Sequence, residues 1–180
     1  MEPVQIIDER ELAADLEAAI RRALVMCFPK DAEFFSHSRA WHGSAPAFSA
    51  VIVENEGVIA HLGVVLRRIK VGGSAVEVAG VQNLCVLPEY RGQGLCRAVL
   101  SAAMEAAKGR GSDFGMLFCV ADLVSVYERC GWKQLSDRPF IRVDSDGVEK
   151  PLVEGNLPMW LPLVEKEFPA GGVHLAGNDW

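Results

Sequence analysis

Apolar residues recur every three or four positions in several stretches of this chain, which is the spacing of an amphipathic helix packed on a core. The spacing predicts helices over residues 9–27, 31–37, 95–108 and 123–130. Asp8 and Glu11 form a capping-box pattern at the start of the first helix, and Phe28-Pro29 ends its repeat. Glycines follow the last two helices, as expected for helix ends.

Between these helices, runs of β-branched and other apolar residues predict strands. The expected strands cover residues 48–54, 58–71, 75–87, 114–120, 132–135, 140–143 and 159–164. Short glycine-containing segments, 55–57 and 72–74, join the first three strands, so these should form an antiparallel meander. The later order of strand, turn, helix and strand indicates a parallel pair. The chain is therefore expected to have an α/β (α+β) fold, a mixed and mostly antiparallel central sheet flanked by about four helices.

Composition narrows the class of protein. With 180 residues, 50% hydrophobic and 23% charged, the chain is expected to form one soluble domain over residues 1–180. Its net charge of -6 argues against a nucleic-acid partner and favours a cationic or amine-bearing one. The acidic segment 1–22 lacks the apolar core of a secretory signal, and no apolar run reaches the ~20 residues that cross a bilayer. We therefore expect a cytoplasmic protein with no membrane partner.

The cysteines add one restriction. All five are scattered singly, without a CxxC pair. This pattern suits reduced thiols in a cytosol. A zinc site would need clustered ligands, so no metal is expected.

The segment with the clearest chemistry is 81–96, which contains a strand, a proline stop, a glycine-rich turn and the start of a helix. Glycines let backbone N–H groups converge, and the helix adds unpaired donors and a positive dipole end, so the segment should bind an anion. A Walker A loop is excluded because Gly94 is followed by Leu95-Cys96 rather than by Lys and Ser or Thr. The dinucleotide pattern fits weakly, because Arg97 stands at its third glycine position. Another kind of nucleotide-phosphate loop stays open.

Two motifs in the same order resemble one superfamily. Arg91, Gly94 and Cys96 fit the pattern Arg/Gln-x-x-Gly-x-Gly/Ala, with cysteine as the small last residue. This segment resembles the pyrophosphate loop of the GCN5-related N-acetyltransferases (GNAT). Further along, the segment 126–132 resembles the final helix and turn of that superfamily, in which a tyrosine, here Tyr127, is the usual general acid. The resemblance implies the GNAT fold.

The resemblance extends over residues 39–180. The segments 39–43, 57–63, 67–72 and 168–171 look like the rhizobial nodulation N-acyltransferases. Residues 60–61, Tyr127 with Gly131-Trp132, and the ending 176–180 look like the aminoglycoside 2′-N-acetyltransferases. Both families acylate amines on sugars. The resemblance therefore implies an N-acetyltransferase that uses acetyl-CoA or another acyl-CoA, with a small-molecule amine as acceptor.

The same resemblance implies which residues hold the cofactor. They are Leu84, Cys85, Val86, Arg91, Gly92, Gln93, Gly94, Leu95 and Cys96. Backbone N–H groups near Leu84 and Val86, freed by a bulge in the strand, would bind the pantetheine and the developing oxyanion. Tyr127 would protonate the leaving thiolate, unless it only packs its helix.

The general base is less clear. The superfamily commonly places a Glu on the central strand, but Gln82 and Asn83 stand in that stretch. Glu77, earlier on the same strand, and His61, on the preceding one, are the candidates, although each also suits a structural role. This gap leaves a second hypothesis, a GNAT-fold regulatory module that binds acyl-CoA without turnover.

Acceptor recognition is predicted only from residue types. Candidates for the acceptor pocket are Trp41, Gln82, Asn83 and Trp180, and the two aromatic residues are chosen because aromatic rings stack on sugars. The identity of the amine, the length of the acyl group and the formation of a homodimer stay open.

Overall fold

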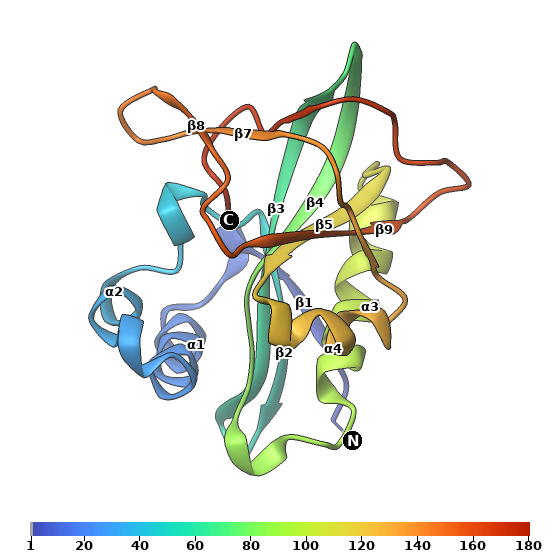
Figure 1. Ribbon diagram of the computed structural model, residues 1–180. Helices are drawn as coiled ribbons and strands as arrows, with labels where there is room; N and C mark the ends of the chain where they lie inside the picture. Colours follow the sequence, from blue (N-terminus) through green and yellow to red (C-terminus); the bar gives the residue numbers. More distant parts are fainter. Residues whose placement is uncertain (1) are drawn as a thin grey trace.

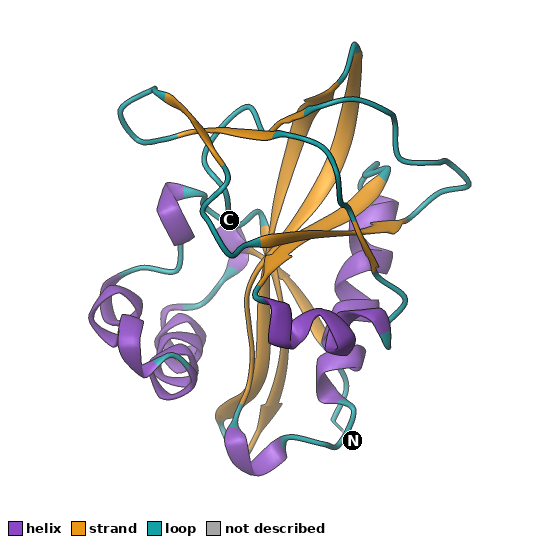
Figure 2. Cartoon of the chain, in the orientation of Figure 1, coloured by secondary structure: helices purple, strands orange, loops and turns teal. Residues whose placement is uncertain are grey.

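One sheet runs through the protein, with helices on both of its faces (Figure 1, Figure 2). The computed structural model describes residues 2–180. The α-helices in this range are α1 (Ala14–Cys27), α2 (Ala32–His37), α3 (Leu95–Gly109) and α4 (Val124–Glu128). The strands are β1 (Gln5–Asp8), β2 (Phe48–Glu54), β3 (Gly57–Val71), β4 (Ser74–Val86), β5 (Phe114–Cys119), β6 (Lys133–Gln134), β7 (Phe140–Val143), β8 (Glu149–Pro151), β9 (Leu157–Pro162) and β10 (Val173–His174). Short 3-10 turns cover Glu9–Glu11, Pro29–Asp31, Trp41–Gly43, Pro88–Tyr90 and Ala121–Leu123.

The strand order is β6-β9-β5-β4-β3-β10-β7-β8. The edge of β3 that pairs with β10 at its end pairs with β2 along its first half, and β1 pairs with β2. The pairs β2–β3 and β3–β4 are antiparallel, as the short glycine turns predict. The pair β4–β5 is parallel, and α3 crosses between these strands. The predicted mixed and mostly antiparallel sheet around a parallel pair is confirmed.

Helices cover the two faces because each has one apolar side. On one face, Ile20 and Leu24 of α1 are fully buried and pack in a cluster with Val51 of β2. On the other face, Val99 and Ala103 of α3 are fully buried in the main core cluster. Figure 1 shows α1 and α2 on one side of the strands and α3 and α4 on the other. Both layers therefore reach the carboxyl end of β4.

The parallel pair β4–β5 is short, and this opens the sheet. Its register runs from Val78↔Phe114 to Gly80↔Met116. Beyond Gly80 the two strands diverge, so the second half of β4 lacks a neighbour on that side among the described strands. Backbone groups that would otherwise join the ladder are left available to a ligand.

A bulge interrupts β4 in this open half. His61 of β3 lies opposite Cys85, whereas Gly63 lies opposite Gln82, so β4 contains one extra residue between these pairs. Asn83 sits there with φ of 54°, the left-handed region that asparagine tolerates better than most residues.

The C-terminal tail folds back onto the sheet. Trp180 is 5% exposed, and its Nε1 donates a hydrogen bond to Met116 O at 3.3 Å. Its ring covers Gly80 so closely that a Cβ there would lie 2.2 Å from the ring. Gly80 therefore has a packing reason to lack a side chain.

Most predicted elements are present, but the first helix and the tail differ from expectation. Residues 9–11 form a 3-10 turn and α1 begins at Ala14, so the predicted helix 9–27 is too long. Asp8 makes no capping hydrogen bond; it ends β1, opposite Phe48, and its carboxylate accepts a hydrogen bond from Arg110. Strand pairing with β2 therefore outweighs the local capping pattern. The strands β1, β8 and β10 were not predicted.

Candidate functional site

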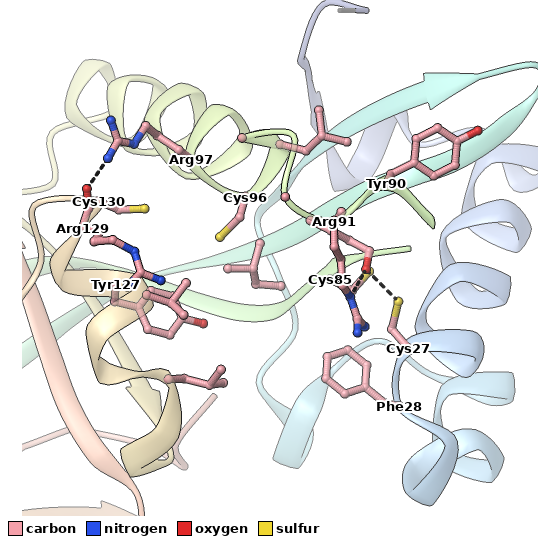
Figure 3. Close-up of a pocket in the computed structure, with 17 residues that line it drawn as sticks. Cys27, Phe28, Cys85, Tyr90, Arg91, Cys96, Arg97, Tyr127, Arg129 and Cys130 are labelled. Atoms are coloured by element: carbon pink, nitrogen blue, oxygen red, sulfur yellow. Dashed lines mark hydrogen bonds between the residues drawn. The ribbon is translucent and has the colours of Figure 1, made fainter. Parts of the chain in front are cut away.

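A cavity of about 640 Å³ opens where β4 and β5 diverge. Its walls come from the end of α1, the end of β4, the loop before α3, the first turn of α3 and helix α4 (Figure 3). The predicted cofactor residues that line it are Leu84, Cys85, Val86, Arg91, Gly92, Gly94, Leu95 and Cys96. Gln93 is not among its described lining residues.

A second cavity, of about 310 Å³, adjoins the first. The two share Phe28, Leu84, Leu123 and Tyr127 as a common wall. Of the predicted acceptor residues, Trp41, Gln82, Asn83 and Trp180 all line the second cavity. Tyr127 is therefore placed between a cavity that meets the glycine loop and a cavity that meets the predicted acceptor residues.

The two cavities differ in charge. The charged side chains that line the first are Arg91, Arg97 and Arg129. In the second, Asp31 is the one charged residue among the described lining side chains. An anionic group is thus favoured in the first cavity and a cationic group in the second.

The loop before α3 presents its backbone to the first cavity. Gly92 and Gly94 have φ of 77° and 81°, and a Cβ on either would meet nothing within 4 Å. The first bond of α3 runs from the Ala98 N–H to Gly94 O at 3.1 Å, so the N–H groups of residues 95–97 have no intrahelical acceptor. Free amides and the helix dipole together suit a phosphate group.

The open edge of β4 adds further donors. The N–H of Leu87 donates to Ile59 O of β3 at 3.0 Å. Because successive N–H groups along a strand point to opposite sides, those of Val86 and Leu84 face away from β3, toward the diverging strands. The Arg91 guanidinium fixes the strand end, since its Nε donates to Val86 O at 3.1 Å.

Tyr127 points its hydroxyl into the space between β4 and α4 (Figure 3). The residue is 9% exposed, and within residues 2–180 its hydroxyl has no hydrogen-bond partner. Burial raises the pKa of Tyr127 well above its usual value, with a further contribution from the nearby cysteine thiols. The phenol therefore stays protonated at neutral pH and is available as a proton donor.

His61 is completely buried behind the bulge of β4. Its Nδ1 lies 3.1 Å from Asn83 O, and its Nε2 lies 3.3 Å from Ser49 Oγ. Burial, together with the positive charge of Arg39, lowers the pKa of His61 to about 3. A neutral imidazole of this kind donates from Nδ1 to the Asn83 carbonyl and binds a proton only weakly.

The amide side chains beside the bulge also have partners. Asn83 Nδ2 donates to Arg39 O at 2.7 Å. Gln82 Nε2 donates to Ser44 O at 2.8 Å, and Gln82 Oε1 accepts from the Trp41 N–H at 3.1 Å. These bonds tie the segment before β2 to the second cavity.

Glu77 lies far from both cavities. It stands opposite Arg68 in the antiparallel pair β3–β4, and its Oε1 accepts a hydrogen bond from Arg68 Nε at 2.5 Å. At ~3.3 Å per residue, the stretch of β4 from Glu77 to Val86 spans about 30 Å. The structure therefore does not bring Glu77 to Tyr127.

Sequence reasoning missed several lining residues. Phe28 and Asp31 follow α1, and Arg97 and Arg129 lie on or next to α3 and α4. Arg97 also donates a hydrogen bond to Arg129 O, which joins these two helices. The one available signal was the apolar periodicity of α1. It identifies the buried side of that helix, which packs on the sheet and places Phe28 beside β4.

The described residues contain no group of His, Cys, Asp or Glu side chains arranged to hold a metal ion. Over residues 2–180, the helices are too short or too polar to span a membrane.

Comparison with solved structures identifies the fold. The GNAT family N-acetyltransferase YhbS from Escherichia coli, solved in complex with CoA, matches with a TM-score of 0.69 and 18% sequence identity. The match covers 98% of this chain and 91% of that one. The diverging β4–β5 pair and the glycine loop before α3 are thus features of a GNAT fold, as the two sequence motifs predicted.

Comparison with sequence families gives a narrower assignment. The family model for nodulation protein A (NodA) matches residues 4–172, and the chain belongs to this family. Nodulation protein A of Azorhizobium caulinodans is 34% identical over 80 residues, which are 44% of this chain and 35% of that protein. An aminoglycoside 2′-N-acetyltransferase of Mycolicibacterium fortuitum is 27% identical over 128 residues, 71% of this chain and 63% of that protein. Each match thus covers less than two thirds of the relative's length. The predicted resemblances to the nodulation N-acyltransferases and to the aminoglycoside 2′-N-acetyltransferases are both confirmed.

Proposed function

We propose that this chain is an N-acyltransferase that moves an acetyl or other acyl group from acyl-CoA to a primary amine, with an amino sugar as the acceptor class. The main support is that the Tyr127 hydroxyl, the free edge of β4 and the glycine loop all face one cavity (Figure 3). The names of the relatives, nodulation protein A and aminoglycoside 2′-N-acetyltransferase, agree with an amino-sugar acceptor.

The pyrophosphate of acyl-CoA is assigned to the loop 91–96. Gly92 and Gly94 leave open space where other residues would place a Cβ, and the N–H groups of residues 95–97 have no helical acceptor. Arg97 and Arg129 supply positive charge at the same end of the cavity. These residues fit a polyphosphate, whose negative charge a helix N-terminus and arginines stabilise.

The thioester is assigned to the space between the bulge and Tyr127. The N–H groups of Leu84 and Val86 would bind the pantetheine and the carbonyl oxygen, on which negative charge develops as the amine attacks. The Tyr127 hydroxyl would give its proton to the leaving sulfur, and the phenolate would regain a proton from the attacking nitrogen, which loses one as the amide forms. His61 is assigned a positioning role, because it holds the Asn83 carbonyl and is too weak a base to accept the amine proton.

The amine is assigned to the second cavity, at Asp31. Asp31 lines this cavity together with the aromatic residues Phe28, Phe35 and Trp41, and the rings of Phe35 and Trp41 are stacked with centroids 5.5 Å apart. No salt bridge to Asp31 occurs in the described part of the chain. A free carboxylate next to aromatic faces suits an ammonium ion.

The first experiment compares thermal stabilisation by acetyl-CoA, CoA and ADP. A ligand present at 100 times its Kd stabilises the folded state by about 2.7 kcal/mol. With all three ligands at one common concentration, we expect larger shifts with CoA and acetyl-CoA than with ADP, because pantetheine adds contacts along β4 and lowers Kd. Equal shifts with CoA and ADP would argue for a nucleotide-phosphate site, and the absence of any shift would refute acyl-CoA binding.

The role of Asp31 makes a separate prediction. Replacing Asp31 by Asn removes the one negative charge at the second cavity, so KM for an amino-sugar acceptor should rise about tenfold while KM for acetyl-CoA stays unchanged. Steady-state kinetics with glucosamine-containing acceptors measure both constants. Glu33, exposed on α2, gives a matched control, and Glu33→Gln should change neither. An equal rise for both substrates would indicate a general structural defect instead.

One observation favours a second candidate function, a regulatory module that binds acyl-CoA without turnover. Among the described residues lining the first cavity there is no carboxylate, and the strand positions beside the thioester are Gln82 and Asn83. Such a module would show the thermal shift with CoA but no product with any amine. An ammonium ion held at Asp31 can lose a proton to water and attack as the uncharged amine, which needs no dedicated base on the chain, so the enzyme remains the better supported proposal.

A further inference from the structure

Two thiols meet at the edge of the first cavity. Cys27 ends α1, and its Sγ donates a hydrogen bond to Val86 O at 3.6 Å. Cys85, the neighbour of Val86 on β4, is 5% exposed, and its thiol is hydrogen-bonded to the sulfur of Cys27. Figure 3 shows the two sulfur atoms side by side, with Cys27 at the cavity wall. One thiol is thus accessible and the second lies directly behind it.

Positive charge lies next to this pair. Arg91 donates its Nε to the same carbonyl, Val86 O, that accepts from Cys27, so the guanidinium is close to both sulfurs. The hydrogen bond from Cys85 and the charge of Arg91 lower the pKa of Cys27 to about 7, although burial and Glu89 act in the opposite direction. About half of Cys27 is then thiolate at pH 7, and the thiolate is the reactive form.

We propose that Cys27 is a site of reversible covalent modification by small disulfides, and that Cys85 resolves the adduct into a Cys27–Cys85 disulfide. Two cysteines on different elements, one open to a ligand cavity and one buried behind it, have the arrangement of an attacking and a resolving thiol. An adduct on Cys27 occupies the space assigned above to acyl-CoA, so the modification and acyl-CoA binding exclude each other.

The chemistry is a thiol–disulfide exchange in two steps. The Cys27 thiolate attacks one sulfur of a small disulfide, forming a mixed disulfide and releasing one thiolate. The Cys85 thiol then loses its proton, and its sulfur attacks Cys27 Sγ and releases the second thiolate. Cys27 and Cys85 together lose two electrons, which reduce the small disulfide to two thiols. The hydrogen bond with Cys27, which raises the pKa of Cys85, is lost in the first step, and this favours the second.

A second pair of cysteines, Cys96 and Cys130, lies on the opposite wall of the cavity and can be compared with Cys27 and Cys85. Cys96 of α3 is hydrogen-bonded to Cys130, after α4, and no arginine contributes to its pKa. Burial, with a contribution from Cys130, raises the pKa of Cys96 to about 11. At pH 7 a much larger fraction of Cys27 than of Cys96 is thiolate, but the thiolate of a more acidic thiol is a weaker nucleophile. With both effects included, Cys27 should react about 100-fold faster than Cys96 at pH 7.

The test is the reaction of the whole protein with an aryl disulfide that releases a coloured nitrobenzoate thiolate, followed at pH 7. The wild-type protein should show a fast phase that releases two thiolates and leaves no aryl group on the protein by mass spectrometry. Cys85→Ser should release one thiolate and keep the aryl group. Cys27→Ser should lose the fast phase, whereas Cys130→Ser, a change in the same cavity, should keep it. Acetyl-CoA, which has no free thiol to react with the disulfide, should slow the fast phase at least tenfold when present at 100 times its Kd.

Each contrary result has a definite meaning. A fast phase that persists in Cys27→Ser, or two thiolates from Cys85→Ser, overturns the assignment of the two thiols. A fast phase that acetyl-CoA leaves unchanged, although acetyl-CoA raises the melting temperature, overturns the mutual exclusion. If acetyl-CoA neither protects Cys27 nor raises the melting temperature, the proposed acyl-CoA site fails, while the reactivity of Cys27 is judged by the variants alone.

Discussion

Tyr127→Phe is expected to lower the rate of acyl transfer by about 10² to 10⁴ and to leave the Kd for CoA within about twofold. The hydroxyl is the one atom removed, and it faces the cavity without a partner within residues 2–180. Its loss therefore removes the proton donor for the leaving sulfur and little packing. The measurement is product formation from acetyl-CoA and an amino-sugar acceptor, followed by chromatography, with CoA binding measured by calorimetry.

Tyr90 provides a matched control, since it is the other tyrosine of the chain. Its hydroxyl donates to Glu54 Oε2 at 2.6 Å and points away from the cavity in Figure 3. Tyr90→Phe should cost a surface hydrogen bond and change kcat by less than about threefold. If Tyr127→Phe retained wild-type kcat, Tyr127 would be a packing residue and the leaving thiolate would depart without its help.

The pH profile gives a second check on Tyr127. Burial raises its pKa, so the phenol remains protonated as the pH rises from 7 to 9. The rate should therefore not fall over this range because of Tyr127, and it should rise where the acceptor amine loses its proton. A decline in kcat that begins near pH 8 in the wild-type protein, and is absent from Tyr127→Phe, would contradict the assigned protonation state.

The sheet was largely predictable because its strands follow local rules. The β2–β3–β4 meander is set by alternating apolar runs and short glycine turns, and these signals lie within each hairpin. The strands β1 and β10 were not predictable in the same way. Gln5–Asp8 has only four residues, and Val173–His174 lies in a glycine-rich tail. Each becomes a strand only because a distant partner, β2 or β3, presents a free edge.

The candidate site likewise has a part that local sequence predicts and a part that depends on packing between distant segments. The loop 91–96 was predictable because its glycines, its proline stop and the helix that follows are contiguous in the sequence. Asp31 and Cys27 were not, because they reach the cavities through the packing of α1 against the sheet, which no local pattern specifies. Glu77 illustrates the opposite error: it is on the predicted strand but at the end far from the cavity.

His61 is expected to make the folded state sensitive to acid. Its pKa is about 3 when folded, against 6.5 in the unfolded chain, because burial and Arg39 disfavour the charged ring. Below pH 6.5 the unfolded state therefore binds a proton that the folded state does not bind, and stability falls as the pH decreases. The loss has a slope of up to about 1.4 kcal/mol per pH unit and reaches about 2 kcal/mol between pH 7.5 and pH 5.

Urea unfolding at pH 7.5, 6 and 5 would measure this loss in the wild-type protein and in His61→Asn. Asparagine keeps an N–H donor near the position of Nδ1, so it can still hold the Asn83 carbonyl, but it does not titrate. The wild-type protein should lose about 2 kcal/mol more than His61→Asn over this range, whereas exposed His37→Asn should lose as much as the wild type. If the difference in the free energy of unfolding between the wild type and His61→Asn were the same at all three pH values, His61 would have the same pKa in the folded and unfolded states. His61 would then again be a candidate general base.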